Sequence, residues 1–141
     1  MVESPTTARR ILFVCAGNTC RSPMAAAIAR QMLGETVRAE SAGVAAADGA
    51  AVTKDAVRAM QERGLDISGH RSRSFAAVDL TTFDLLVALT PAISHDVRSA
   101  GVEPSRVATL DIPDPYDKGL DAYRVTAAAL ERDLKTLFDQ F

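Results

Sequence analysis

Residues 10–23 read RILFVCAGNTCRSP, and this stretch decides the fold. The run Ile11–Val14 places bulky apolar residues on both faces and is too short for a helix, which indicates a buried strand of a parallel sheet. Ser22 suits the N-cap and Pro23 the first position of a helix, which we predict over residues 24–33. The loop 15–22 therefore joins a buried strand to a helix.

The rest of the chain repeats this alternation. Further strands are predicted over residues 36–40, 83–89 and 106–110, and further helices over residues 53–63, 91–100 and 121–139. Strands that alternate with helices predict an α/β fold, here a three-layer sandwich with a four-stranded parallel sheet and helices on both faces. Residues 1–9 are polar and are predicted to form a flexible N-terminal tail, ahead of a single domain over residues 10–141.

The composition is that of a globular protein and excludes several function classes. The 141 residues are 48% apolar and 24% charged, with a formal net charge of −2, so no global basic field attracts nucleic acid. No apolar run reaches the roughly 18 residues of a membrane span, and the start of the chain lacks the pattern of a signal peptide. Two cysteines make no disulfide scaffold. These features predict a cytoplasmic protein with reduced thiols and without a nucleic-acid or membrane partner.

The loop has the form C-x5-R-S, which predicts an anion site with a nucleophile at its centre. Backbone N–H groups at a helix N-terminus bind anions, and Gly17 and Asn18 tolerate the left-handed conformations that such a turn requires. Arg21 provides a planar fork for two phosphate oxygens, and this positive field would stabilise the Cys15 thiolate. The residues predicted to bind phosphate are Ala16, Gly17, Asn18, Thr19, Cys20, Arg21 and Ser22.

A second loop follows the last predicted strand and lies at the same end of the sheet as the first. Transfer of a phosphoryl group to sulfur requires an acid that protonates the leaving group. Asp114, kept extended by the proline that follows it, is the predicted acid. Asp111 and Asp117 are alternatives, and a plain turn-forming role for Asp114 is also open. Tyr116, two residues further on, is predicted to wall the pocket.

Four stretches resemble the low-molecular-weight protein-tyrosine phosphatases, in the order of that family and across nearly the whole chain. They are Val14–Met24, Ser41–Gly43, Ser68–Arg71 and Asp114–Tyr116. The resemblance implies a four-stranded parallel sheet with five helices, and a phosphorylated protein as substrate, with phosphotyrosine as the leading candidate. It implies no metal and no organic cofactor, and inorganic phosphate as product and inhibitor.

The resemblance also implies roles for individual residues. Cys15 would be the nucleophile that forms a phosphocysteine, Arg21 the phosphate clamp and Asp114 the general acid. Cys20 would trap oxidised Cys15 as a reversible disulfide. A hydrogen-bond network that holds the loop would be formed by Asn18, Ser22, Ser41 and His70. The single domain, residues 10–141, would then be a phosphatase domain.

Purely structural roles for the two cysteines are alternatives to these catalytic roles. Free cysteine is often buried, so both could be core residues, and packing in the first helical turn accounts for Cys20 at least as well as a redox role. The two thiols could be half of a zinc site, but neither a C-x2-C nor a paired-histidine spacing supports one. The strand, the loop and Arg21 together favour the nucleophile for Cys15.

The substrate has a second candidate. Tyrosine-directed members of the family usually carry a bulky aliphatic residue at the position of Thr19, where this chain resembles the bacterial protein-arginine phosphatases. Residues 45–47 also lack an aromatic side chain that would wall the pocket. A thiol-dependent arsenate reductase, a further alternative, would need relay cysteines; none follows Cys20, so this function would require a thiol from outside the chain. A phosphate-binding module that has lost catalysis would lack Cys15, Arg21 or Asp114, and all three are present.

Overall fold

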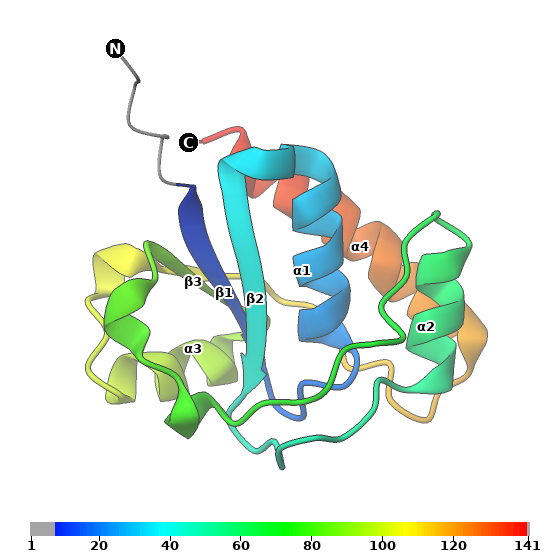
Figure 1. Ribbon diagram of the computed structural model, residues 1–141, viewed down its shortest axis with the longest axis horizontal. Coiled ribbons are helices and arrows are strands. Elements are labelled where there is room, and N and C mark those ends of the chain that lie inside the picture. The colour runs from blue at the N-terminus through cyan, green and yellow to red at the C-terminus, as the bar shows by residue number, and fades with distance from the viewer. Residues whose placement is uncertain (1–7, 141) are drawn as a thin grey trace.

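The computed structural model describes residues 8–140 and contains the predicted three-layer α/β sandwich (Figure 1). Its four parallel strands pair in the order β2-β1-β3-β4. The strands are β1 (Arg9–Cys15), β2 (Val37–Gly43), β3 (Leu85–Ala88) and β4 (Val107–Thr109). The α-helices of the described residues are α1 (Arg21–Leu33), α2 (Lys54–Gln61), α3 (Pro91–Ser99) and α4 (Leu120–Phe138). The prediction of a parallel sheet with helices on both faces is confirmed.

The helices divide unequally between the two faces of the sheet. Figure 1 shows α1, α2 and α4 on one side and α3 on the other. Side chains of β1 alternate between these layers: Phe13 packs in the cluster that contains α1 and α4 residues, whereas Leu12 and Val14 pack with Ile93 and Val97 of α3. Because β1 is buried on both faces, its sequence is continuously apolar rather than alternating.

The order of the strands places both predicted loops at one end of the molecule. The chain passes from β1 outward to β2 on one side, and from β3 outward to β4 on the other. Between β1 and β3 the winding therefore reverses, which is where open α/β sheets bind their ligands. The segment after β4 stays beside β3, since Leu110 N–H donates to Ala88 O and Ile112 N–H to Leu89 O. This pairing carries the Asp114 loop towards the loop that follows β1.

Several predicted boundaries were wrong by a few residues. Arg9 was assigned to the tail but pairs with Val37 in the sheet, while residues 1–7 of that predicted tail lie outside the described residues. The first helix begins at Arg21, and its N-cap is Cys20 rather than Ser22. The Ser22 hydroxyl contacts the Cys15 and Asn18 side chains instead of capping the helix. Within residues 8–140 there are four α-helices rather than the expected five, together with short 3-10 turns.

The last helix, α4, matches its prediction within one residue at each end. Its apolar residues Tyr123, Leu130 and Leu134 are fully buried, and α4 packs beside α1 and α2 on the same face of the sheet (Figure 1). Most of its exposed side chains are polar, as expected for a helix at the surface of a globular domain, although Val125 is exposed as well. None of the helices within residues 8–140 is long and apolar enough to cross a membrane.

Candidate active site

Cys15 ends β1, and the loop that follows curls back around its sulfur. The Asn18 N–H donates to Cys15 Sγ over 3.3 Å, and Ser22 Oγ lies 2.9 Å from the same sulfur. Cys15 is 1% exposed. Two hydrogen-bonding groups, one from the middle of the loop and one from the first turn of α1, therefore converge on one buried sulfur.

Asn18 is the residue that holds the loop in this shape. It is fully buried with a φ of 57°, a left-handed conformation that asparagine tolerates better than most residues. Its Nδ2 donates to Ser22 Oγ (2.8 Å) and to Ser41 Oγ (2.9 Å). Its Oδ1 accepts the Arg73 N–H over 2.8 Å. The side chain thus ties the loop to β2 and to the segment beyond α2.

His70 completes this network from the far side of Asn18. Its Nε2 lies 3.1 Å from Asn18 O and 3.3 Å from Asn18 Oδ1. Both of those atoms are acceptors, so Nε2 carries the proton and donates. Burial lowers the pKa of His70, as do the charges of nearby arginines. His70 is therefore neutral at pH 7. The structure brings together all four residues of the predicted loop-holding network, Asn18, Ser22, Ser41 and His70.

Gly17 does not behave as predicted. Among the described residues of the loop, only Asn18 has a positive φ; Gly17 does not. Gly17 lies exposed on the outside of the turn, and a Cβ there would meet Thr19 Oγ1 at an ordinary 3.6 Å. Asn18 adopts the left-handed conformation because hydrogen bonds hold both the nitrogen and the oxygen of its side-chain amide.

Gly43, at the end of β2, allows the loop to lie against the sheet. Val44 N–H donates to Cys15 O and Ala45 N–H to Ala16 O, each over 2.9 Å. A Cβ on Gly43 would overlap the Ala16 carbonyl oxygen and lie 2.9 Å from Asn18 N. Only glycine therefore fits where β2 meets the loop.

We expect Gly43→Ala to destabilise the protein by about 1–3 kcal/mol, because the added methyl group must push the loop away from β2. Thermal or urea denaturation measures the loss. Gly69→Ala is the matched control, since no described atom lies within 4 Å of a Cβ there. Equal stability of the two variants would contradict the role of the close contact.

Arg21 lies almost entirely inside the site, with 8% of its side chain exposed. Its Nη1 donates to Ile112 O over 3.0 Å, and its Nη2 lies 3.8 Å from Asp114 Oδ2. Within residues 8–140, its buried Nε has no hydrogen-bond partner. Buried donors are rarely left unpaired, so this guanidinium is anchored on one side and has a donor left for an anion.

Asp114 and Tyr116 form a turn at the mouth of the site. Asp114 Oδ1 accepts the Tyr116 N–H over 3.0 Å, the bond of an Asx turn, while Oδ2 faces Arg21. The Asp114 side chain is 53% exposed and Tyr116 is 61% exposed. Asp114 therefore acts as a turn former and still presents its carboxyl group to the loop. Tyr116 stands open at the mouth.

Cys20 differs chemically from Cys15 although both are buried free thiols. Burial, followed by the nearby charge of Cys15, raises the pKa of Cys20 to about 11. The protonated thiol faces Asp114 Oδ1 over 3.9 Å. Thr19 precedes it, half-buried, and its carbonyl accepts the Thr53 N–H over 3.0 Å. The Cys20 thiol is therefore protonated at neutral pH and lies at the edge of the site.

The structure thus places a buried cysteine in a loop that ends at Arg21, at the switch point of a parallel sheet. A comparison with known families agrees with this site. The family model described as low molecular weight phosphotyrosine protein phosphatase matches residues 10–141. The chain belongs to this family. It is therefore a cysteine-dependent phosphatase that acts on phosphorylated proteins. No group of three or more His, Cys, Asp or Glu side chains that could hold a metal lies within the described part of the phosphatase.

Relatives of this phosphatase carry two kinds of name. A probable low molecular weight protein-tyrosine-phosphatase, EpsP, from Ralstonia nicotianae is 34% identical over 133 residues, covering 88% of this chain and 90% of the relative. A protein-arginine-phosphatase from Bacillus subtilis is 34% identical over 143 residues, covering 92% and 95%. The crystal structure of a low molecular weight protein tyrosine phosphatase from T. tengcongensis has a TM-score of 0.87 at 35% identity, covering 95% and 100%.

Sequence reasoning missed three groups at the site of this phosphatase. The Arg73 N–H that holds Asn18, the Ile112 carbonyl that anchors Arg21, and the space that Gly43 leaves were not predicted. Two of these contacts come from backbone atoms, which any residue type carries, and so they leave no signal in the sequence. Gly43 did leave a signal in the sequence, because it is the last residue of Ser41–Gly43, one of the four stretches that resemble the family.

Proposed function

We propose that this phosphatase hydrolyses phosphotyrosine in proteins through a phosphocysteine at Cys15. The observation that carries the proposal is the buried Cys15 sulfur, which Asn18 N–H and Ser22 Oγ contact, in a site whose Arg21 has a buried Nε without a partner among the described residues. A nucleophile that faces a preorganised set of anion-binding donors suits phosphoryl transfer. Relatives named as protein-tyrosine-phosphatases support the choice of substrate.

In the first step, the Cys15 thiolate attacks phosphorus; the S–P bond forms as the P–O bond to the tyrosine oxygen breaks. Loop N–H groups and Arg21 hold the non-bridging oxygens, where charge develops in the transition state. Asp114 gives its proton to the leaving phenolate. The Ser22 hydroxyl, 2.9 Å from Cys15 Sγ, can donate to the sulfur and stabilise it as an anion before the attack.

In the second step, water attacks phosphorus and the S–P bond breaks. Asp114, now a carboxylate, takes the proton of that water, and the thiolate leaves with the same support from Ser22 and Asn18 N–H. Inorganic phosphate is released. Because phosphate is bound by the same donors as the substrate, it is also expected to inhibit.

Asp114→Asn is expected to lower kcat on a phosphotyrosine peptide by about 10²- to 10⁴-fold, the usual contribution of a general acid. An aryl phosphate with a far more acidic leaving group should lose less, because its phenolate departs without a proton. Rates on a series of aryl phosphates measure the difference. Asp117→Asn tests the alternative acid; a larger loss in that variant than in Asp114→Asn would reassign the role.

Reducing conditions suit this chemistry, and we propose that the enzyme works in the cytoplasm. Cys15 and Cys20 are both free thiols, and the nucleophile is lost on oxidation. The raised pKa of Cys20, about 11, keeps its own thiol protonated and slow to react at neutral pH. A redox role, in which Cys20 traps oxidised Cys15, stays a prediction for this pair.

Phosphoarginine is the second candidate substrate, and Thr19 is the observation that favours it. Thr19 is half-buried within the loop, and its carbonyl is held by Thr53. Its hydroxyl can bond a polar guanidinium phosphate or a water, where an aliphatic side chain would pack an aryl ring. Tyr116 is largely exposed and does not close an aromatic pocket. Relatives named as protein-arginine-phosphatases are 33–34% identical to this chain.

Values of kcat/KM on matched phosphotyrosine and phosphoarginine peptides decide between the two substrates. Phosphate release is measured without acid, since the N–P bond is acid-labile, and the Cys15→Ser protein is the blank. We expect the tyrosine peptide to be preferred by more than about tenfold, roughly 1.4 kcal/mol of transition-state stabilisation. The reverse preference would assign phosphoarginine. Release no faster than the blank on either peptide would contradict the proposed function.

A further inference from the structure

A cavity of about 490 Å³ lies beside the catalytic loop, between α1, the edge strand β2 and the segment 66–73. Its volume is typical of a small-molecule site. Ala26 and Arg30 of α1 form one wall, and Glu40 of β2 lies on another. His70, Arg71 and Arg73 close the third side. The cavity is built from three segments that meet only in the folded chain.

Two of its arginines are not neutralised by a carboxylate. Arg30 Nη1 donates to Ala39 O over 2.8 Å. Arg71 Nη1 donates to His70 O over 2.9 Å and to Ser68 O over 3.3 Å. No carboxylate within residues 8–140 forms an ion pair with either side chain. Carbonyl groups orient a guanidinium without cancelling its charge. Partial burial lowers the pKa of Arg30, as expected for a cation that lacks a counter-charge.

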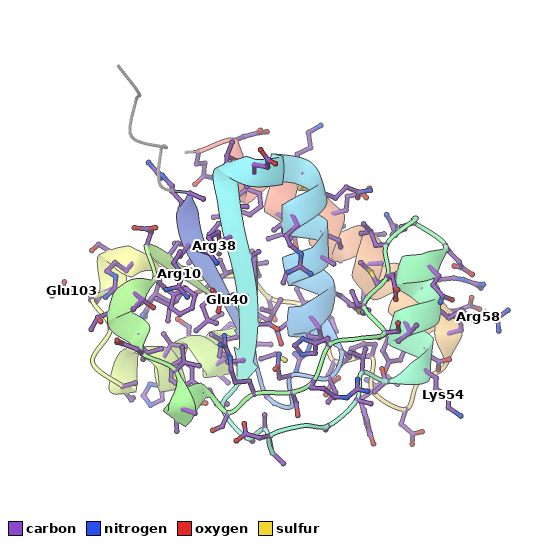
Figure 2. All side chains as sticks on the ribbon, in the orientation of Figure 1. Arg10, Arg38, Glu40, Lys54, Arg58 and Glu103 are labelled. Carbon is purple, nitrogen blue, oxygen red and sulfur yellow. The ribbon has the colours of Figure 1, made fainter. Side chains whose placement is uncertain are left out.

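The acids of the cavity do not supply the missing counter-charge. Glu40 Oε2 is bound by Arg10 Nη2 at 2.6 Å and Oε1 by Arg73 Nη2 at 3.2 Å. Figure 2 shows Arg10 and Glu40 on adjacent strands. Asp66 Oδ1 accepts the Ser68 N–H over 2.9 Å. Glu40 is shared between two arginines, and no ion pair among the described residues joins Asp66 to Arg30 or Arg71. The arginines that line the cavity outnumber its carboxylates, so the cavity is positive.

We propose that this cavity is a second anion-binding site, which takes a phosphate dianion, free or as the end of a small phosphate ester. Arg30 and Arg71 present planar forks, the geometry that binds phosphate oxygens in pairs. The remaining volume leaves room for the organic part of an ester. Residues of the catalytic centre, Cys15, Arg21 and Asp114, do not line this cavity.

The bound anion would touch the support of the catalytic loop. His70 lines the cavity and donates through Nε2 to Asn18. Arg30, Arg71 and Arg73 each disfavour the charged form of His70, and an anion among them would oppose that effect. Coupling between two binding sites is reciprocal. Phosphate in the catalytic loop and the ligand of the cavity are therefore expected to alter one another's affinity.

The test is a titration of the isotopically labelled full chain with inorganic phosphate, followed by amide NMR at constant ionic strength. Amides of the cavity segment, Ile67, Gly69 and Arg71, report one site, and those of Gly17 and Thr19 report the catalytic loop. We expect two saturable curves with different Kd values. AMP is expected to shift the cavity amides and adenosine to leave them unchanged. Tighter binding of AMP than of phosphate would identify an ester as the ligand; the reverse would identify free phosphate.

Two variants locate the site. Arg71→Ala should weaken binding in the cavity by about tenfold, the loss of one charge-assisted hydrogen bond. Arg98→Ala removes an exposed cation of α3, on the other face of the sheet, and should change neither curve. Ala26→Glu places a carboxylate against the cavity and should abolish the phosphate curve there. Three results would overturn the proposal: cavity amide signals that do not shift with phosphate, that shift as much with adenosine as with AMP, or that shift as much in Arg71→Ala as in the unmodified protein. Loop amides that fail to respond would instead count against the proposed phosphatase site.

Discussion

Replacing Cys15 with serine is expected to lower kcat by about 10⁴-fold or more, equivalent to roughly 5.5 kcal/mol of activation free energy. The hydroxyl of serine is a much weaker nucleophile than the sulfur of cysteine, which Asn18 N–H and Ser22 Oγ contact in the structure. The loop keeps its donors in this variant. Phosphate is therefore expected to bind with a Kd close to that of the unmodified protein, so that kcat falls while binding persists.

Cys20→Ser is the matched control for this experiment. The two cysteines lie five positions apart and both are buried, but the Cys20 thiol, with a pKa of about 11, is not poised to attack. Its replacement should keep kcat within about tenfold, well short of the loss of a nucleophile. A kcat of Cys15→Ser comparable to that of Cys20→Ser would show that the chemistry does not pass through Cys15.

Arg21→Lys is expected to lower kcat/KM by about 10³-fold, within the range of an arginine that stabilises a phosphoryl-transfer transition state. Lysine keeps the positive charge but loses the planar fork. In the structure, Nη1 is used to anchor the side chain on Ile112 O, which leaves Nε free for a ligand. The three donors of an ammonium group share one nitrogen, so lysine cannot reproduce donors on separate nitrogens of a planar fork. The loss should appear mainly in kcat, because the charge that attracts the substrate remains.

Arg98→Lys controls for the substitution itself, since Arg98 is exposed on α3. Because Arg21 is buried, thermal denaturation must accompany the kinetics. A Tm close to that of the unmodified protein would assign the loss to chemistry. An activity within about tenfold of the unmodified enzyme would show that a point charge is enough and that the fork has no special part.

The local pattern of apolar residues in the sequence was sufficient to predict the layers of this fold. The run Ile11–Val14 indicated a doubly buried strand, and β1 is one, because an apolar block of this length can be hidden only between two layers. The helix predicted to begin at residue 91 does begin there as α3, and Thr90 caps it, accepting the Ile93 N–H over 3.2 Å. Ser22 failed as a cap although its residue type is suitable, because its hydroxyl has two partners in the loop that local reasoning did not see.

The sequence by itself determined the chemistry that is available: a cysteine and an arginine six residues apart between a strand and a helix, and an aspartate in a later loop. Only the tertiary structure decided how these groups are held. Of the two residues predicted to tolerate a left-handed conformation, Gly17 and Asn18, Asn18 adopts it, because partners from β2 and from the segment beyond α2 hold its amide. The basic cavity arises in the same way, since Arg30 lies far from His70 and Arg71 in the chain and lines the same cavity only on folding. Spacing along a chain records residue types and local conformation, whereas contacts between distant segments depend on packing.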